Sequence, residues 1–171
     1  ILTSSDGKYS ANQEKAISLI EQGKPLKEGE PTIIETPNQK TIEELSNSNN
    51  FDQTQIIKVL LYLASTEDKK KQPVLVSIRG DQEINEIKLS NELSRQLEKN
   101  ILGLTAIKHD DIKLQGISPI PFGFVGPDLS DSILSNAESW EKFFIRITDN
   151  SAADLNSFIC GNNKKDQHRI Y

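Results

Sequence analysis

The residues best placed for chemistry follow an apolar stretch near the middle of the chain. Four of the five residues from Val74 to Ile78 are aliphatic, which predicts a strand over Pro73–Arg79 that is buried on both faces. A glycine-containing turn follows, and the polar segment behind it reaches Lys88. An ammonium group at that point can bind a phosphate or polarise an ester if it faces a cleft. A lone lysine is also typical of a plain solvated surface, so its type alone leaves both interpretations open.

A second candidate is the segment Gly123–Pro127, which contains Gly123, Gly126 and Pro127. Such a loop can present consecutive backbone N–H groups to an oxyanion or to a substrate carbonyl. Only glycine allows another group to approach the backbone this closely. The glycines and prolines of Gly116–Leu129 predict an irregular, functional loop around it. Taken alone, the five-residue pattern is equally typical of a simple turn.

Metal and nucleotide chemistry have no support in the sequence. The chain has two histidines, His109 and His168, and one cysteine, Cys160, which are too few for a metal-binding constellation. Neither phosphate-binding glycine motif occurs, and no serine lies in a Gly-x-Ser-x-Gly elbow. We therefore predict no metal site.

The composition indicates one domain that does not bind nucleic acid through a basic surface. The chain has 171 residues and a formal net charge of −5, whereas proteins that grip phosphate backbones are basic. We find neither a signal peptide nor an apolar run of membrane-spanning length, so a cytoplasmic setting is the default expectation. The sequence lacks methionine and begins at Ile1, which indicates a segment of a longer protein.

The remaining elements alternate between helix and strand. Gly23 and the apolar stripe before it predict a helix over Ala11–Gln22. Thr41 is expected to cap a helix that is broken by 47–50, and a further helix should start at Asp52 or Thr54. Its apolar side would be Ile56, Ile57, Leu60, Leu61 and Ala64. Further helices are expected over Ser90–Lys99 and His109–Leu114, extended segments over Thr32–Thr36, Leu104–Ile107 and Phe143–Thr148, and a short helix or turn over Ser151–Ile159.

Several of these segments together resemble a known family. The pattern Arg-Gly-Asp-His-x-x-Asn-Glu-x-Lys is matched at Arg79, Gly80, Asp81, Asn85, Glu86 and Lys88, with Gln82 in place of the usual histidine. Gly123–Pro127 fits a Gly-x-x-x-Pro loop, and Gly161, Asn163 and His168 fit a Gly-Ala-Asn…His segment, with Asn162 replacing alanine. Thr36–Leu45 and Ile57–Leu60 add two further matches. The chain thus resembles the editing domain inserted in bacterial prolyl-tRNA synthetases, one of the YbaK-like aminoacyl-tRNA deacylases.

This resemblance implies an α/β (α+β) fold of YbaK-like type, a mixed and curved β-sheet surrounded by helices, with a core over about 11–168. It implies hydrolysis of mischarged alanyl-tRNA(Pro), because a site sized for proline rejects smaller alanine poorly. Catalytic roles would fall to Lys88, Gly123, Gly126 and Pro127. Substrate-binding roles would fall to Val76, Ile78, Arg79, Asp81, Asn85 and His168. The pocket wall would be one face of the predicted strand, either Val74, Val76 and Ile78, which we favour, or Leu75 and Ser77.

The expected partners are the acceptor end of tRNA(Pro) carrying alanine and the rest of the parent synthetase, with no membrane. No cofactor is expected for the editing domain, since ATP and Mg²⁺ would belong to the synthetic domain of the parent enzyme. The alternative function is a non-catalytic insert that positions tRNA or stabilises the synthetase, for which the departure at Gln82 leaves room.

Overall fold

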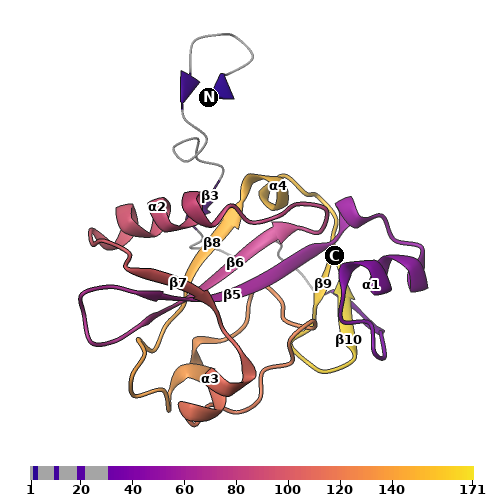
Figure 1. The fold of residues 1–171 in the computed structure, drawn as a ribbon. Coiled ribbons are helices and arrows are strands. Elements are labelled where there is room, and N and C mark those ends of the chain that lie inside the picture. Colours follow the sequence, from indigo (N-terminus) through magenta and orange to yellow (C-terminus); the bar gives the residue numbers. More distant parts are fainter. Residues whose placement is uncertain (1, 4–9, 12–18, 22–30) are drawn as a thin grey trace.

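A five-stranded mixed sheet lies at the centre of the molecule (Figure 1). The computed structural model describes Leu2–Thr3, Ser10–Ala11, Leu19–Glu21 and residues 31–171. The order of the strands in the sheet is β3-β8-β6-β5-β7, where β6 and β8 are parallel and the other neighbours are antiparallel. Their bounds are Leu19–Glu21 (β3), Ile57–Ser65 (β5), Gln72–Arg79 (β6), Gly103–Ala106 (β7) and Ile145–Asp149 (β8).

A smaller antiparallel sheet stands beside the first, in the order β4-β10-β9. Its strands are Thr32–Glu35 (β4), Ile159–Gly161 (β9) and Gln167–Ile170 (β10). A parallel bridge between Ile56 and Ile159 connects β9 to the start of β5. Near the N-terminus, β1 (Leu2–Thr3) pairs with β2 (Ser10–Ala11). The bridge brings the C-terminal hairpin next to the central sheet.

The helices lie around the two sheets, with α2 and α3 on opposite faces of the central one (Figure 1). They are α1 (Ile42–Asn49), α2 (Glu86–Leu97), α3 (His109–Leu114) and α4 (Asn150–Ala153), with 3₁₀ turns at Gln53–Gln55 and Asp131–Leu134. Thr41 caps α1 as predicted, through a capping box with Glu44. None of the helices in the described part of the chain is long and apolar enough to cross a membrane.

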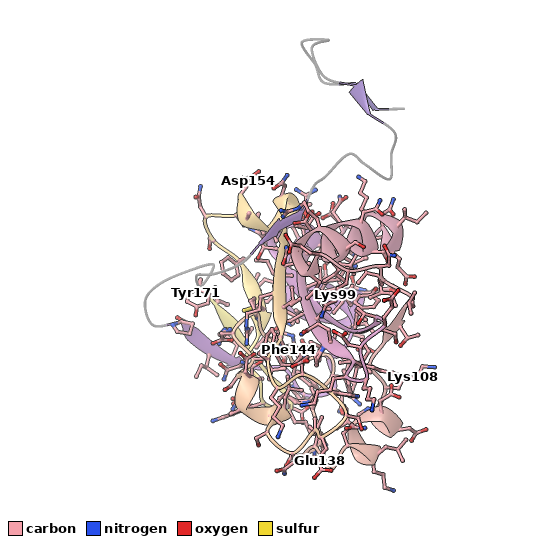
Figure 2. All side chains as sticks on the ribbon, turned by 90° about the vertical axis from the view of Figure 1, so that its left-hand side faces the viewer. Lys99, Lys108, Glu138, Phe144, Asp154 and Tyr171 are labelled. Atoms are coloured by element: carbon pink, nitrogen blue, oxygen red, sulfur yellow. The ribbon has the colours of Figure 1, made fainter. Side chains whose placement is uncertain are left out.

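The core has two main parts, one on each face of the central sheet. Above the sheet in Figure 1, Val74 and Val76 of β6 pack with Leu89 and Leu93 of α2. Below it, Leu75 packs against α3 and the irregular chain that follows. Figure 2 shows side chains filling both sides, with Asp154 and Glu138 marking opposite ends of the molecule. The prediction that this strand is buried on both faces is confirmed, as is the mixed α+β fold class.

The helix predicted after Asp52 is wrong. After one 3₁₀ turn the chain forms the nine-residue strand β5, which pairs with β6 along Ile57–Ala64 and with β7 along Tyr62–Ser65. Its apolar residues fit a helical spacing, but a strand covered on both faces also reads as a nearly continuous apolar run. Pairing on both edges decides the outcome.

Other elements also differ from the predicted ones. The helix α1 runs through 47–49 and ends at Asn50, which adopts the left-handed conformation. The helix α2 begins at Glu86, four residues earlier than predicted, because Asn85 caps it. Of the helix predicted over Ala11–Gln22, residues 12–18 and Gln22 lie outside the described residues, and Leu19–Glu21 form strand β3.

Candidate functional site

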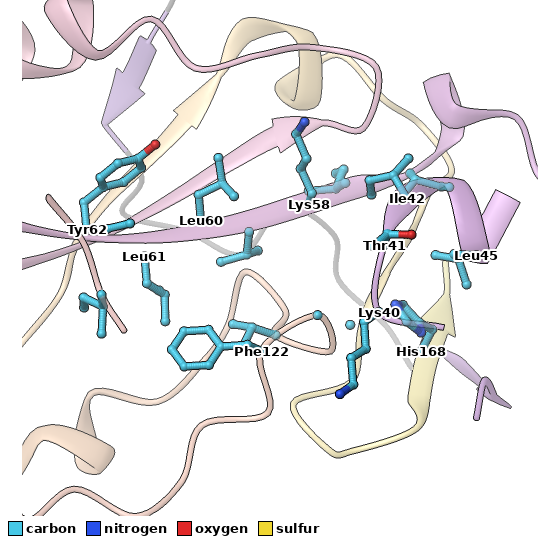
Figure 3. A pocket seen from close by; sticks show the side chains of 18 residues that line it. Lys40, Thr41, Ile42, Leu45, Lys58, Leu60, Leu61, Tyr62, Phe122 and His168 are labelled. Atoms are coloured by element: carbon cyan, nitrogen blue, oxygen red, sulfur yellow. The ribbon is translucent and has the colours of Figure 1, made fainter. Parts of the chain in front are cut away.

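A cavity of about 340 Å³ lies along β5, between the central sheet and the loop that contains Gly123 (Figure 3). Figure 3 shows Lys58, Leu60 and Tyr62 on one side of the strand, and Leu61, Phe122 and Lys40 on the other. Aliphatic and aromatic side chains form most of its wall. The lining residues are Lys40, Thr41, Ile42, Leu45, Ile56, Ile57, Lys58, Val59, Leu60, Leu61, Tyr62, Ala106, Ile107, Phe122, Gly123, Val125, Gly161 and His168.

One wall of this cavity is an open strand edge. The pairing of β7 with β5 covers only Tyr62–Ser65, and the bridge to β9 lies at Ile56, so no strand of the described chain pairs with this edge between the two. On the β6 side, Gly80 N donates to Ile56 O at 2.7 Å, and on the β7 side Ile107 N donates to Leu61 O at 2.9 Å. Backbone groups alternate between the two edges of a strand. The N–H and C=O groups of Val59, which lines the cavity, therefore point toward its open edge.

The opposite wall is the Gly123–Pro127 loop, and its amides divide into two sets. Phe124 N donates to Pro121 O at 2.9 Å, and Gly126 N donates to Asn163 Oδ1 at 2.7 Å. Among the described residues, no hydrogen bond engages the N–H of Gly123 or of Val125, and both residues line the cavity. These two amides are the donors that remain available to a ligand.

Three glycines allow the loop to pack closely on its neighbours. Gly123 has a φ of +86°, and a Cβ there would lie 2.8 Å from Lys40 O. A Cβ on Gly126 would lie 2.4 Å from Gly161 O, and one on Gly161 would lie 2.2 Å from the carbonyl carbon of Phe124. Side chains do not fit at such distances, so the loop rests directly on the backbone of β9.

His168, on β10, is buried against this loop with a relative exposure of 4%. Its Nδ1 lies 2.6 Å from Thr36 Oγ1, and its ring meets the edge of Phe124 with 5.4 Å between centroids. Burial lowers the pKa of His168 to about 4, although a hydrogen bond with the backbone of Gly123 opposes the shift. The ring is therefore neutral at pH 7 and serves as a fixed hydrogen-bonding wall of the cavity.

This burial makes stability depend on pH. Because the folded pKa of about 4 lies below the ordinary value of 6.5, the unfolded chain binds the proton more readily between these values. We therefore expect the free energy of unfolding to keep its full value above about pH 6.5 and to fall by roughly 3 kcal/mol, on account of His168, as the pH drops to about 4.

Urea unfolding of the wild type and of His168→Gln across pH 4–7 measures this slope. His168→Gln should lose this dependence of the unfolding free energy on pH, whereas His109→Gln, at an exposed histidine, should keep it. Parallel curves for wild type and His168→Gln would contradict the assignment.

The motif around Arg79 lies outside the cavity lining. Arg79 Nε and Asp81 Oδ1 form an ion pair at 2.5 Å. Asn85 caps α2, since its Oδ1 accepts hydrogen bonds from Ile87 N and Lys88 N at 3.1 Å each. Lys88 itself lies in the first turn of α2. The structure therefore does not bring these residues together with Gly123 and His168, and their predicted site roles stay predictions.

The strand that lines the cavity is β5, not β6. Val76 packs under α2, Ile78 is also buried, and neither lines the cavity. The strand β6 lies between β8 and β5, so both of its edges are paired and both of its faces are covered. The face that we favoured, with Val74 and Val76, is the one turned toward α2.

Sequence reasoning missed two cationic residues of the cavity, Lys40 and Lys58. Lys58 has 18% of its side chain exposed, and its Nζ lies 3.9 Å from Glu83 Oε1, whose side chain is 95% exposed. The available signal was a charged residue within the apolar run of β5. Within the described part of the chain, no aspartate or glutamate lines the cavity, and no cluster of three or more His, Cys, Asp or Glu side chains is suited to a metal.

The comparisons with known proteins agree with this geometry. A family model described as an aminoacyl-tRNA editing domain matches residues 36–170. The chain is 64% identical over 171 residues to a proline–tRNA ligase of Prochlorococcus marinus (strain NATL2A), covering 100% of this chain and 29% of that protein. It is 48% identical over 169 residues to the proline–tRNA ligase of Synechococcus sp. (strain CC9311), covering 99% of this chain and 28% of that protein.

A solved structure, described as hypothetical protein APE2540, shares the fold. Its TM-score is 0.55 at 15% identity, over 83% of this chain and 80% of that one. The chain spans less than a third of the length of the two proline–tRNA ligases to which it was compared. The family match itself covers the cavity, the glycine loop and His168, and the chain belongs to the aminoacyl-tRNA editing domain family.

Proposed function

We propose that this chain hydrolyses the ester of alanyl-tRNA(Pro), as the editing domain of a proline–tRNA ligase. The observation that carries the proposal is the arrangement of two backbone walls around one cavity. The free amides of Gly123 and Val125 lie on the loop, and the open edge of β5 at Val59 lies on the strand. Backbone donors held in fixed positions stabilise the oxyanion that develops when an ester is attacked.

In the proposed mechanism, the Gly123 and Val125 amides orient the ester carbonyl. Lys58, which lines the cavity, would hold the terminal phosphate or adenosine, the role that the sequence suggested for Lys88. Among the residues that the structure describes, no carboxylate lines the cavity, and Nδ1 of His168 is engaged by Thr36. Attack by water would therefore be assisted by the ribose hydroxyl of the substrate itself, rather than by a protein base.

Selectivity for alanine would come from the wall opposite the strand. One missing methylene is worth only about 1–3 kcal/mol in a pocket, so a synthetic site sized for proline admits alanine. A second, smaller sieve can remove it. The rings of His168 and Phe122 line the cavity and would limit the size of the amino acid. The remainder of the ligase would deliver the tRNA end, and ATP and Mg²⁺ would serve only its synthetic site.

The test is release of amino acid from alanyl-tRNA(Pro) and prolyl-tRNA(Pro). We expect selective release of alanine, by this chain at high concentration and by the ligase that contains it. Absence of hydrolysis in both forms would overturn the proposal and favour a non-catalytic insert that positions tRNA or stabilises the synthetase. Equal release of both amino acids would support hydrolysis but contradict the alanine sieve.

A further inference from the structure

We propose that Asn163 is a positioning residue that aims the glycine loop at the substrate, and that Asp128 and Arg169 fix its orientation. The inference rests on the proposed function, because it explains how the loop amides come to face the cavity. Asn163 itself does not line the cavity; it lies behind the loop, in the turn between β9 and β10.

Asn163 holds two successive peptide groups of the loop. Its backbone N–H donates to Phe124 O at 2.8 Å, and its Oδ1 accepts from Gly126 N at 2.7 Å. The peptide bonds of the loop are trans, so the N–H of each peptide points away from its C=O. Phe124 O and Val125 N–H belong to the same peptide group, so when Phe124 O is bonded to Asn163, Val125 N–H points away from Asn163. In the next peptide group, the bond from Gly126 N likewise turns Val125 O away from Asn163. Since Val125 lines the cavity, this amide is directed toward a ligand.

The side-chain amide of Asn163 works only in one of its two orientations. Its Nδ2 donates to Asp128 Oδ1 at 2.9 Å. An ionised carboxylate accepts hydrogen bonds and cannot donate, so Asp128 requires the NH₂ group of Asn163 on its side. The amide oxygen then faces Gly126 N. A flipped amide would set NH₂ against N–H and release the loop.

Asp128 is held in turn by Arg169. The guanidinium Nη1 donates to Asp128 Oδ2 at 3.0 Å, Nη2 bonds Oδ1, and Nε donates to Cys160 Sγ at 3.2 Å. Burial acts to raise the pKa of Asp128, but Arg169 outweighs it and keeps this pKa below its ordinary value. The Arg169 side chain is only 8% exposed, so the pair is anchored from inside the protein.

A simple turn role does not account for these contacts. Asn163 has a φ of 61°, which asparagine tolerates better than most residues. Asn50 has a φ of 56° at the end of α1 and is exposed, with no contact to the loop. Glycine at either position keeps the backbone conformation and removes only the side chain. Asn163→Gly therefore deletes the amide clamp, and Asn50→Gly is the matched control.

The decisive experiment exchanges the two side chains. In Asp128→Asn, the new NH₂ opposes either the NH₂ of Asn163 or the guanidinium of Arg169, and in Asn163→Asp two carboxylates meet. In the double variant D128N/N163D, the carboxylate at 163 accepts from both Gly126 N and the NH₂ of the amide at 128, and the net charge is unchanged. This NH₂ replaces Oδ1 of Asp128, so Arg169 keeps only one of its two acceptors at position 128. We expect each single variant and Asn163→Gly to lower kcat for alanyl-tRNA by about tenfold or more with little change in KM, since misdirected oxyanion donors act on the transition state.

The double variant should recover part of the loss, because the carboxylate at 163 again holds Gly126 N, whereas Arg169 keeps only one acceptor at position 128. Amide hydrogen exchange at Gly126 gives a readout besides activity. Exchange should be slow in the wild type, in Asn50→Gly and in the double variant, and fast in Asn163→Gly and the two single variants. The assays use the protein that carries this chain at its natural length. Wild-type kcat in Asn163→Gly, or a double variant that recovers neither kcat nor slow Gly126 exchange, overturns the inference. An inactive wild type with slow Gly126 exchange that depends on Asn163 would instead refute the proposed function alone.

Discussion

Replacing Gly161 with alanine is expected to lower catalysis by about 100-fold and the free energy of unfolding by roughly 3 kcal/mol. An added Cβ would lie 2.2 Å from Phe124 C, 2.3 Å from Phe124 O and 2.6 Å from Val125 C. All of these are backbone atoms, which cannot rotate away as a side chain can. Either β9 or the loop must move, and the loop carries the proposed oxyanion donors.

Urea unfolding and alanyl-tRNA hydrolysis measure the two effects of Gly161→Ala separately. Gly103→Ala is a matched control in strand β7, where the nearest atoms to a new Cβ are those of Ser65 at 3.8 Å, an ordinary contact. We expect that control to change stability by less than about 1 kcal/mol. An unfolding midpoint and a hydrolysis rate for Gly161→Ala that match those of Gly103→Ala would show that the loop does not depend on this contact.

The Gly161 contact also shows what sequence can and cannot place. The Gly123–Pro127 loop and the segment ending at His168 were both predicted to be functional, but as separate motifs. Their meeting depends on the bridge between Ile56 and Ile159, which sets β9 beside the start of β5. Pairing between segments about 100 residues apart leaves no local pattern in the residues themselves.

The strongest local signals predicted the fold correctly. The buried strand β6, the cap at Thr41 and the short helix α3 each depend on residues close in sequence. The helix predicted in place of β5 failed because its apolar spacing satisfies both periods, and only the pairing with β6 and β7 selects the strand. Because of this single difference, the cavity is lined by β5 and not by the predicted strand β6, and β5 supplies the open edge and Lys58.

Backbone chemistry explains why the rest of the site escaped prediction. The groups of Val59 face the cavity because β7 stops pairing at Tyr62, and no residue type signals where a partner strand ends. The Asn163 clamp likewise joins residues 37 positions apart in sequence. A glycine loop indicates that amides are presented, but which amides remain free depends on the groups behind it.

Replacing Lys58 with methionine is expected to reduce alanyl-tRNA hydrolysis by about 100-fold while leaving the fold intact. Lys58 lines the cavity, whereas its partner Glu83 is 95% exposed, so removing the ammonium leaves no buried charge unpaired. Methionine keeps the apolar stem that packs beside β5. Single-turnover hydrolysis, with circular dichroism and urea unfolding as folding controls, measures the effect. Lys58→Arg should retain part of the rate, because the positive charge stays.

Lys88→Met is the matched variant, because the sequence motif pointed to that lysine and the cavity geometry points to Lys58. Lys88 lies in the first turn of α2 and does not line the cavity. We expect Lys88→Met to stay within about twofold of wild type, since a cation outside the site contributes only a screened, long-range attraction. Loss of activity in Lys88→Met with full activity in Lys58→Met would reverse the assignment and place the substrate at the start of α2, outside the cavity. Losses in both would mean that the tRNA end spans the edge of β5, from the cavity to the start of α2.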